Sequence, residues 1–362
     1  MTKDRNILST VSGLSLELFK YPYQKHVPHE YKFSDIERQA LIDEIDKLLH
    51  KNVIVTVDWA EEQYVSNIFL REKKDGSYRM ILNLSDLNEM IEYHKFKMDT
   101  LLSAVSLITP NCYMASIYYK DAYYSVPIRR DQRKWLRFMF QGELYEFTCL
   151  PNGLTSGPRL FTKVTKPLFA TLREKGHLNS PYIDDSLLVG DTWEDCANNV
   201  IDTVETSMDA GFVVHFIKSI FIPTQIIEFL GFWLNSQNMT IKLTESKAMT
   251  IKNMCIDMLA FKKPSIRTVA KLVGKMVASF PGNIYGKLFY RILDNEKSAA
   301  LKLHNGNFEA HMRLTESARK DLHWWIENIL DIDCPIVHVN PSVTVFSDSS
   351  LTGWGEGELL AT

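Results

Sequence analysis

The sequence has few cysteines, and their placement excludes two common kinds of small-domain scaffold. The 362 residues contain five cysteines, far apart and without a Cys-x-x-Cys pair. An odd number of widely spaced cysteines does not provide a disulfide framework, and the missing pairs exclude a zinc ribbon. We therefore expect a protein that folds in a reducing, intracellular compartment.

Long apolar stretches are also missing. The first residues, MTKDRNILSTVSG, contain no apolar signal core, and no run of about 20 uncharged apolar residues occurs anywhere. We expect no membrane partner and no secretion, with a location in the cytoplasm or nucleus.

The chain has no excess of positive charge, since its net charge is −3. Only local patches can therefore attract a polyanion. Two stretches are candidates: REKKDGSYR at 71–79, and RRDQRKWLR at 129–137 with five Lys and Arg against one Asp. Such runs are more often solvated faces, and both interpretations stay open here.

Apolar periodicity predicts alternating helices and β-hairpins. Ser34 and Glu37 form a capping box at the start of an amphipathic helix within 33–54. An Asp-Gly turn predicts a hairpin over 64–84. The other expected elements are a strand that ends at KDAY, a long helix within 144–176, hairpins at 182–190 and 227–243, a helix at 192–212, and helices from about 245 to 330. Because strands and helices alternate without a strict βαβ period, we expect an α+β fold with an antiparallel sheet covered by helices.

Two adjacent acids are the strongest candidates for chemistry. Asp184 and Asp185 lie at the tip of the hairpin predicted for YIDDSLLVG. Neighbouring carboxylates repel each other unless a cation lies between them, and Mg²⁺ binds carboxylates together with substrate phosphates. A plain Asp-Asp turn is the alternative for a bare pair.

Five motifs in a fixed order resemble those of reverse transcriptases over about residues 30–330. They are KKDGSYRMILNLSDLN, KDAYYSVPI, LPNGLTSGPRLF, YIDDSLLVG and EFLGFWL. The closing segments ARKDLHWW and VFSDSSLTGWG resemble the polymerase–ribonuclease H segment of DIRS-type retrotransposons. The resemblance implies a right-hand polymerase architecture of fingers, palm and thumb, with an antiparallel palm sheet backed by helices. It also implies that the protein copies an RNA or DNA template by extending a primer with dNTPs.

The same resemblance implies a division of the chain. We expect an N-terminal extension at 1–33, fingers and palm at 34–235 (palm about 106–127 and 165–235), and a thumb or connection at 236–340. Residues 341–362 match the start of a ribonuclease H-like domain. Asp348 matches its first metal-binding acid. Because this activity also needs carboxylates from later elements of that domain, we expect only a truncated start of it here.

Reverse transcriptases use two metal ions, and the resemblance assigns site residues accordingly. It implies Mg²⁺ or Mn²⁺ bound by Asp184 and Asp185, and Lys218 as a catalytic lysine that protonates the departing pyrophosphate. The implied nucleotide-binding residues are Lys73, Arg79, Asp121, Ala122, Tyr123 and Asn152, and the implied primer grip is Phe229, Leu230 and Gly231. Each assignment has a structural alternative. Lys73, Arg79 and Lys218 could be solvated surface charges, Tyr123 could be a core tyrosine, and the segment with Phe229, Leu230 and Gly231 could be a buried hairpin.

One position departs from the family pattern. The first catalytic acid of the family stands three residues before the Asp of KDAY, and this sequence has Tyr118 there. Asp121 matches the second, local acid and could replace the first only by a shift of strand register. A phenol with a pKa of about 10 is not an anion at neutral pH. We therefore expect impaired catalysis. The alternatives are a non-catalytic nucleic-acid-binding remnant and an active polymerase with an altered metal site.

A second departure is Pro181, directly before the hairpin tip. Proline cannot donate a ladder hydrogen bond, so Pro181 predicts either a weakened hairpin or an edge strand.

Overall fold

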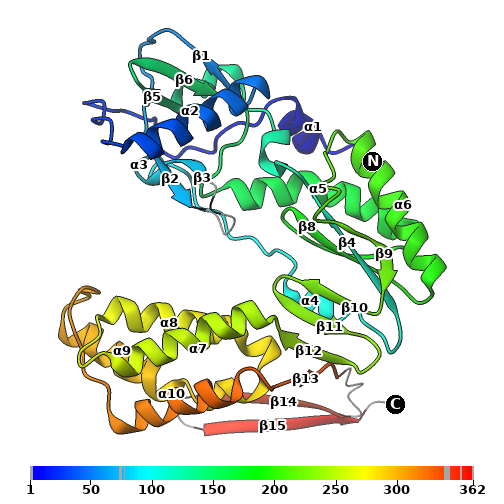
Figure 1. Cartoon of the computed structure of the whole chain (residues 1–362). Helices are drawn as coiled ribbons and strands as arrows, with labels where there is room; N and C mark the ends of the chain where they lie inside the picture. The colour runs from blue at the N-terminus through cyan, green and yellow to red at the C-terminus, as the bar shows by residue number, and fades with distance from the viewer. Residues whose placement is uncertain (1–2, 73–75, 77, 338–342, 351–352, 361–362) are drawn as a thin grey trace. The chain divides into compact units, whose positions relative to one another are not determined.

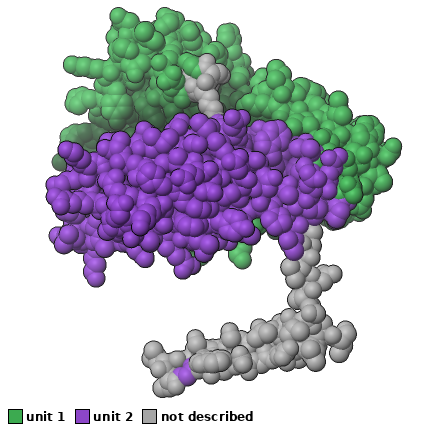
Figure 2. Space-filling view, turned by 60° about the horizontal axis from the view of Figure 1, so that its bottom comes forward, with its two compact units in different colours: residues 1–107, 111–225 green, residues 108–110, 226–362 purple. Residues whose placement is uncertain are grey.

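The structure is a computed structural model that describes residues 3–72, 76, 78–337, 343–350 and 353–360. The chain divides into two compact units, which are coloured separately in Figure 2. The first unit comprises residues 1–107 and 111–225, and the second comprises residues 108–110 and 226–362. The finer division into fingers, palm and thumb stays a prediction.

The first unit contains a four-stranded antiparallel sheet in the order β7-β8-β4-β9. Figure 1 labels β8, β4 and β9 of this sheet. Its strands are β7 (Leu178–Tyr182), β8 (Asp185–Gly190), β4 (Tyr113–Tyr118) and β9 (Ile220–Thr224). Helices α5 (Gly157–Glu174) and α6 (Trp193–Asp209) contact each other and the strands. The expected α+β arrangement, an antiparallel sheet covered by helices, is confirmed.

Both edge strands of this sheet carry a proline. Pro181 lies in β7 and Pro223 lies in β9, and each of these strands pairs with one neighbour. At an edge, the missing N–H of proline costs no ladder hydrogen bond. Of the two explanations for Pro181, the edge strand is confirmed.

A second group of elements in the first unit packs around helix α2 (Asp35–His50). The predicted capping box is present: the Ser34 side chain accepts from the Glu37 N–H, and the Glu37 carboxylate accepts from the Ser34 N–H. Strands β1 (Ile54–Thr56), β6 (Glu143–Phe147) and β5 (Arg137–Phe140) form an antiparallel sheet. The expected hairpin comprises β2 (Ile68–Glu72) and β3 (Tyr78–Leu82), and Gly76 is the one residue of its turn that the structure describes.

Short helices complete the first unit. They are α1 (Arg5–Ser12), α3 (Ser85–Asn88), α4 (Leu101–Val105) and the 3₁₀ segments η1 (Ala122–Ser125) and η2 (Arg130–Trp135). The KDAY strand therefore ends in a single 3₁₀ turn.

Two of the five cations in the basic run at 129–137 pair with acids from other parts of the chain. Arg137 is buried, and its Nε and Nη2 atoms lie 2.8 and 2.6 Å from the Glu146 carboxylate. Lys134 pairs with Glu62 at 3.1 Å. These cations are neutralised by the protein's own carboxylates, which favours the structural explanation of this run over a polyanion patch.

The second unit combines a small sheet with helices. Strands β10 (Ile226–Phe229), β11 (Phe232–Asn235), β12 (Thr240–Leu243) and β13 (Cys334–Pro335) are antiparallel, so the hairpin expected at 227–243 is part of a larger sheet. The predicted helical region is confirmed and contains α7 (Glu245–Ala260), α8 (Ile266–Ser279), the 3₁₀ segments η3 (Phe280–Gly282) and η4 (Ile284–Lys287), α9 (Arg291–Leu303) and α10 (Glu316–Asn328).

Strands β14 (Val343–Ser350) and β15 (Gly353–Leu360) pair antiparallel near the end of the chain. Asp348 lies in β14, but its side chain is outside what the structure describes. Across the described residues, none of the helices combines the length and apolar character needed to cross a bilayer.

Candidate functional site

The hairpin of β7 and β8 brings two acids next to Tyr118. Strands β4 and β8 pair so that Tyr118 lies opposite Asp185, and the Tyr119 N–H donates to the Asp184 carbonyl at 2.7 Å. Asp184 occupies the turn, and Asp185 is the first residue of β8. The family pattern puts Tyr118 at the position of the first catalytic acid, which implies a place on the strand beside the acidic tip, and the structure confirms this placement.

The tip holds strained backbone. Ile183, which precedes Asp184, has a φ of 56°. A β-branched residue rarely adopts this left-handed conformation, which costs on the order of 1–3 kcal/mol. Such strain persists only where the surroundings fix it, and here the paired strands on both sides of the tip do so.

The Tyr118 ring is enclosed by polar and cationic groups. Its phenol is hydrogen-bonded to the Asp184 carboxylate. Lys218 Nζ lies 4.6 Å from the centre of its ring, and the His215 ring meets it edge-on at 5.9 Å. Two hydrogen bonds hold the backbone of Tyr118 in place. Its N–H donates to Ser219 Oγ at 3.0 Å, and its carbonyl accepts from the His215 N–H at 2.7 Å.

This environment keeps the Tyr118 phenol neutral. Burial raises its pKa most, and the hydrogen bond to Asp184 and the charges of Asp184 and Asp185 raise it further. The positive charge of Arg79 acts in the opposite direction without cancelling these effects. Tyr118 is therefore not an anionic ligand at neutral pH.

The segment after β4 supplies the next group of predicted residues. The Tyr123 ring packs against Phe161 with ring centres 5.5 Å apart, and burial, followed by the charge of Asp184, raises the pKa of Tyr123 to about 12. Asn152 Nδ2 donates to the Tyr124 hydroxyl at 3.3 Å. The Ala122 side chain is buried beside them.

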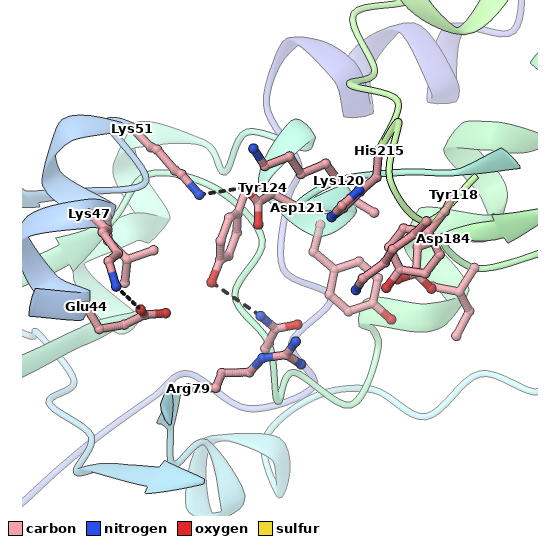
Figure 3. Close-up of a pocket in the computed structure, with 16 residues that line it drawn as sticks. Glu44, Lys47, Lys51, Arg79, Tyr118, Lys120, Asp121, Tyr124, Asp184 and His215 are labelled. Carbon is pink, nitrogen blue, oxygen red and sulfur yellow. Dashed lines mark hydrogen bonds and ion pairs between the residues drawn. The ribbon is translucent and has the colours of Figure 1, made fainter. Parts of the chain in front are cut away.

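Asp121 is held away from the acidic tip by a partner at the end of helix α2. Its carboxylate lies 2.7 Å from Lys51 Nζ, and its backbone has a φ of 53°. Asp121 therefore forms an ion pair inside the same cavity, as Figure 3 shows, and does not supply the acid that is missing at Tyr118.

These residues line a cavity of about 480 Å³ that lies wholly within the first unit. Figure 3 shows Glu44 and Lys47 of α2 on one side and Tyr118 and Asp184 on the other, with Arg79 of β3 also reaching in. Lys218 lines the same cavity. Arg79, Asp121, Ala122, Tyr123, Asn152, Asp184 and Lys218 are the sequence-predicted residues that the structure brings together here. Asp185 is adjacent but not part of the lining.

Sequence reasoning missed several polar lining residues. They are Glu44, Lys47 and Lys51 in and directly after α2, together with Lys120 and His215. Steps of three and four residues place the first three on one helix face, which was a usable signal. The sequence does not reveal that this face meets the KDAY segment, because that contact is made between residues far apart in the chain.

The remaining predicted residues lie elsewhere. Lys73 is outside the described residues. Phe229, Leu230 and Gly231 belong to the second unit, where Leu230 and Gly231 form the β10–β11 turn with φ values of 49° and 75°. The Leu230 carbonyl accepts a hydrogen bond from Lys247 Nζ at 2.6 Å.

The acidic side chains of the site can be compared with those that two bound metal ions would need. In the described part of the chain, no group of three or more His, Cys, Asp and Glu side chains is arranged to hold a metal ion. The tip offers Asp184 and Asp185, and a neutral phenol stands where a third carboxylate is needed. These residues do not fit two ions that share three carboxylates.

A comparison with protein families matches the middle of the chain. The profile described as "Reverse transcriptase (RNA-dependent DNA polymerase)" matches residues 71–234, a range that includes both Tyr118 and the acidic tip.

Curated relatives are polyproteins that are much longer than this chain. The Transposon Tf2-3 polyprotein of Schizosaccharomyces pombe is 20% identical over 242 residues, which are 66% of this chain and 18% of the relative. The Pro-Pol polyprotein of Simian foamy virus type 1 is 24% identical over 260 residues, covering 69% of this chain and 22% of the relative. The chain thus spans about a fifth of the length of these two relatives.

Solved structures share the fold. The foamy viral protease-reverse transcriptase in complex with dsDNA matches with a TM-score of 0.71 and 18% identity, covering 92% of this chain and 66% of that chain. The same viral protein in complex with RNA/DNA hybrid matches with a TM-score of 0.67 and 16% identity, over 97% of this chain and 45% of that chain. The expected polymerase architecture is therefore confirmed at the level of the fold.

Proposed function

We propose that residues 71–234, which match the reverse transcriptase profile, form a reverse transcriptase domain of the kind found in retrotransposon and retroviral polyproteins. We further propose that this chain binds a primer–template and dNTPs but polymerises poorly. The observation that carries the proposal is the pairing of Tyr118 with Asp185, at the strand position where the family pattern has its first acid. The binding of dsDNA and RNA/DNA hybrid by proteins with this fold supports the choice of partner.

Impaired catalysis follows from charge and size at one position. Asp184 and Asp185 are the proposed ligands of Mg²⁺ or Mn²⁺. In place of the third carboxylate stands the neutral phenol of Tyr118, which is itself hydrogen-bonded to Asp184. Each 1.36 kcal/mol added to the barrier slows a reaction tenfold, so a lost ligand that raises it by several kcal/mol costs roughly 10³-fold or more in rate.

The other site residues keep the roles that the family pattern implies. Lys73 and Arg79 grip the triphosphate, Tyr123 blocks a ribose 2′-hydroxyl, and Asp121, Ala122 and Asn152 shape the nucleotide pocket. Their common position along one cavity supports this assignment for the described members. Lys218 is proposed as the general acid toward pyrophosphate, and Phe229, Leu230 and Gly231 as the primer grip.

The finer lineage and domain assignments are also proposals. We assign the chain to the DIRS-type retrotransposons from ARKDLHWW and VFSDSSLTGWG. Residues 34–235 are proposed as fingers and palm, 236–340 as thumb or connection, and 341–362 with Asp348 as the start of a ribonuclease H-like domain.

Binding and extension measured together test the proposal. Fluorescence anisotropy with an RNA/DNA primer–template should show binding that weakens as salt rises, because phosphate contacts release counterions. Primer extension on poly-rA with oligo-dT should proceed very slowly in the same sample. Absence of binding at low salt would overturn the proposed partner, and rapid extension would overturn the proposed impairment and favour an active polymerase with an altered metal site.

A further inference from the structure

The cavity beside Tyr118 carries more positive than negative charge. Among the described residues five cations line it against three acids, whereas the whole chain has a net charge of −3. The cations are Lys47, Lys51, Arg79, Lys120 and Lys218, and the acids are Glu44, Asp121 and Asp184. Positive charge still prevails when the adjacent Asp185 is added. A cleft lined by one prevailing sign of charge concentrates ligands of the opposite sign.

Two of the three acids are engaged by lysines in and directly after helix α2. Asp121 lies 2.7 Å from Lys51, and Glu44 lies 3.7 Å from Lys47 (Figure 3). Asp184 is the remaining acid of the lining, and its carboxylate accepts from the Tyr118 phenol.

The other three cations have no such partner. Within the described part of the chain, no carboxylate lies within ion-pair distance of Arg79, Lys120 or Lys218. Their positive charges are thus available to an anionic ligand that enters the cavity.

Lys218 occupies a distinctive place among these cations. Its ammonium lies over the face of the Tyr118 ring, 4.6 Å from the ring centre. An aromatic face attracts a cation without neutralising it, so the ammonium keeps its positive charge for another partner. Tyr118, which stands where the family pattern has a metal-binding acid, therefore also positions the Lys218 ammonium at this end of the cavity.

We propose that the cavity binds the polyphosphate of a nucleoside triphosphate without a divalent cation, with Lys218, Arg79 and Lys120 supplying the positive charge. This inference rests on the proposed function, because it takes the cavity to be the nucleotide site. Arg79 can bind phosphate oxygens through two N–H groups at once, whereas the two lysines act as point charges. Filling the site therefore needs no metal ion, in contrast to a site built from three carboxylates.

Calorimetric titration of the full chain with dTTP, in EDTA and in MgCl₂, tests the inference. We expect binding in EDTA that is as tight as in MgCl₂ or tighter. Lys218→Gln should weaken binding in EDTA by about tenfold or more, as expected for the loss of one charge-assisted contact. Lys166→Gln is the matched control, since Lys166 is an exposed lysine of α5 outside the cavity lining and should bind as the unaltered chain does.

A charge change at Tyr118 gives a second readout. Tyr118→Asp adds a carboxylate beneath Lys218, so dTTP binding in EDTA should weaken and MgCl₂ should restore it. Titration with inorganic tripolyphosphate separates the two sources of the ligand chemistry: equal affinity would assign the site to polyphosphate alone and overturn the nucleotide part of the inference.

The proposed function and this inference fail in different ways. Binding of dTTP that requires MgCl₂ in the unaltered chain would overturn metal independence, and so would a Lys218→Gln variant that binds normally. Loss of primer–template binding, measured in the same samples, would instead overturn the proposed function. A thermal melt of each variant shows whether it is folded, and Lys218→Arg, which keeps the charge, should retain binding in EDTA.

Discussion

Tyr118 of β4 and Asp185 of β8 are direct cross-strand neighbours in the first unit. The register of this buried sheet fixes the position of Tyr118, because a shift of one residue would move every side chain of the strand to the opposite face. The phenol cannot be exchanged for Asp121 by a small rearrangement, because Asp121 follows the end of the strand and is paired with Lys51.

Restoring the acid should restore polymerase activity. We expect Tyr118→Asp to increase primer extension on poly-rA with oligo-dT and Mg²⁺ by roughly 10³-fold or more, because it completes a set of three carboxylates. Tyr118→Phe is the matched control, since it removes the phenol hydroxyl without adding a carboxylate, and should stay slow. Equal, rapid extension by the unaltered chain and Tyr118→Asp would contradict the prediction.

Tyr119 should make the protein less stable at high pH. Burial raises the pKa of Tyr119 to about 12, above the ordinary value of about 10, although its hydrogen bond to Ser207 at 2.7 Å lowers it slightly. Between these two values the unfolded chain loses the proton while the folded chain keeps it, so stability must fall as pH rises.

Urea unfolding followed between pH 9 and about pH 12 measures this effect. Tyr119→Phe should flatten the decline in the free energy of unfolding, because phenylalanine has no proton to lose. Tyr93→Phe, at an exposed tyrosine, is the control and should leave the decline unchanged. A decline of equal slope in the Tyr119→Phe variant would show that other groups cause it.

The buried ion pair of Arg137 and Glu146 should matter far more than an exposed one. We expect Glu146→Gln to lower the free energy of unfolding by about 3–5 kcal/mol, because it leaves a buried guanidinium without its counter-charge. Asp131→Asn, which breaks the exposed pair with Arg129, should cost less than about 1 kcal/mol. Similar losses for the two variants, measured by chemical denaturation, would contradict this account.

The capping box of α2 gives a prediction on local stability. Ser34→Ala should destabilise the protein by about 1 kcal/mol, because the Glu37 N–H loses its side-chain acceptor. Thr244→Ala is a suitable control, since Thr244 precedes α7 without a side-chain cap bond in the described structure. Hydrogen exchange in the first turn of α2 should accelerate in the Ser34 variant alone.

The sequence predicted the local elements, and the contact between Tyr118 and the acidic tip, better than it predicted which charged side chains pair with each other in the site. Ser34 and Glu37 identified the start of α2, and the motif order placed Tyr118 beside Asp184 and Asp185. Both features follow from short-range patterns or from family spacing.

Features that depend on tertiary packing were not predictable in the same way. The ammonium of Lys218 over the Tyr118 ring depends on how the loop before β9 folds back on β4. Lys51 reaches Asp121 across 70 positions of the chain. The run at 129–137 has the composition of a nucleic-acid patch, and only its buried partner Glu146 reveals a structural role for Arg137.

The prolines in β7 and β9 limit how the first unit can meet other polypeptides. A sheet edge normally offers a row of N–H and C=O groups to any extended chain nearby. Pro181 and Pro223 interrupt that row on the two outer strands of this sheet. A foreign strand cannot continue a full hydrogen-bond ladder on either side, so self-association by sheet extension is disfavoured.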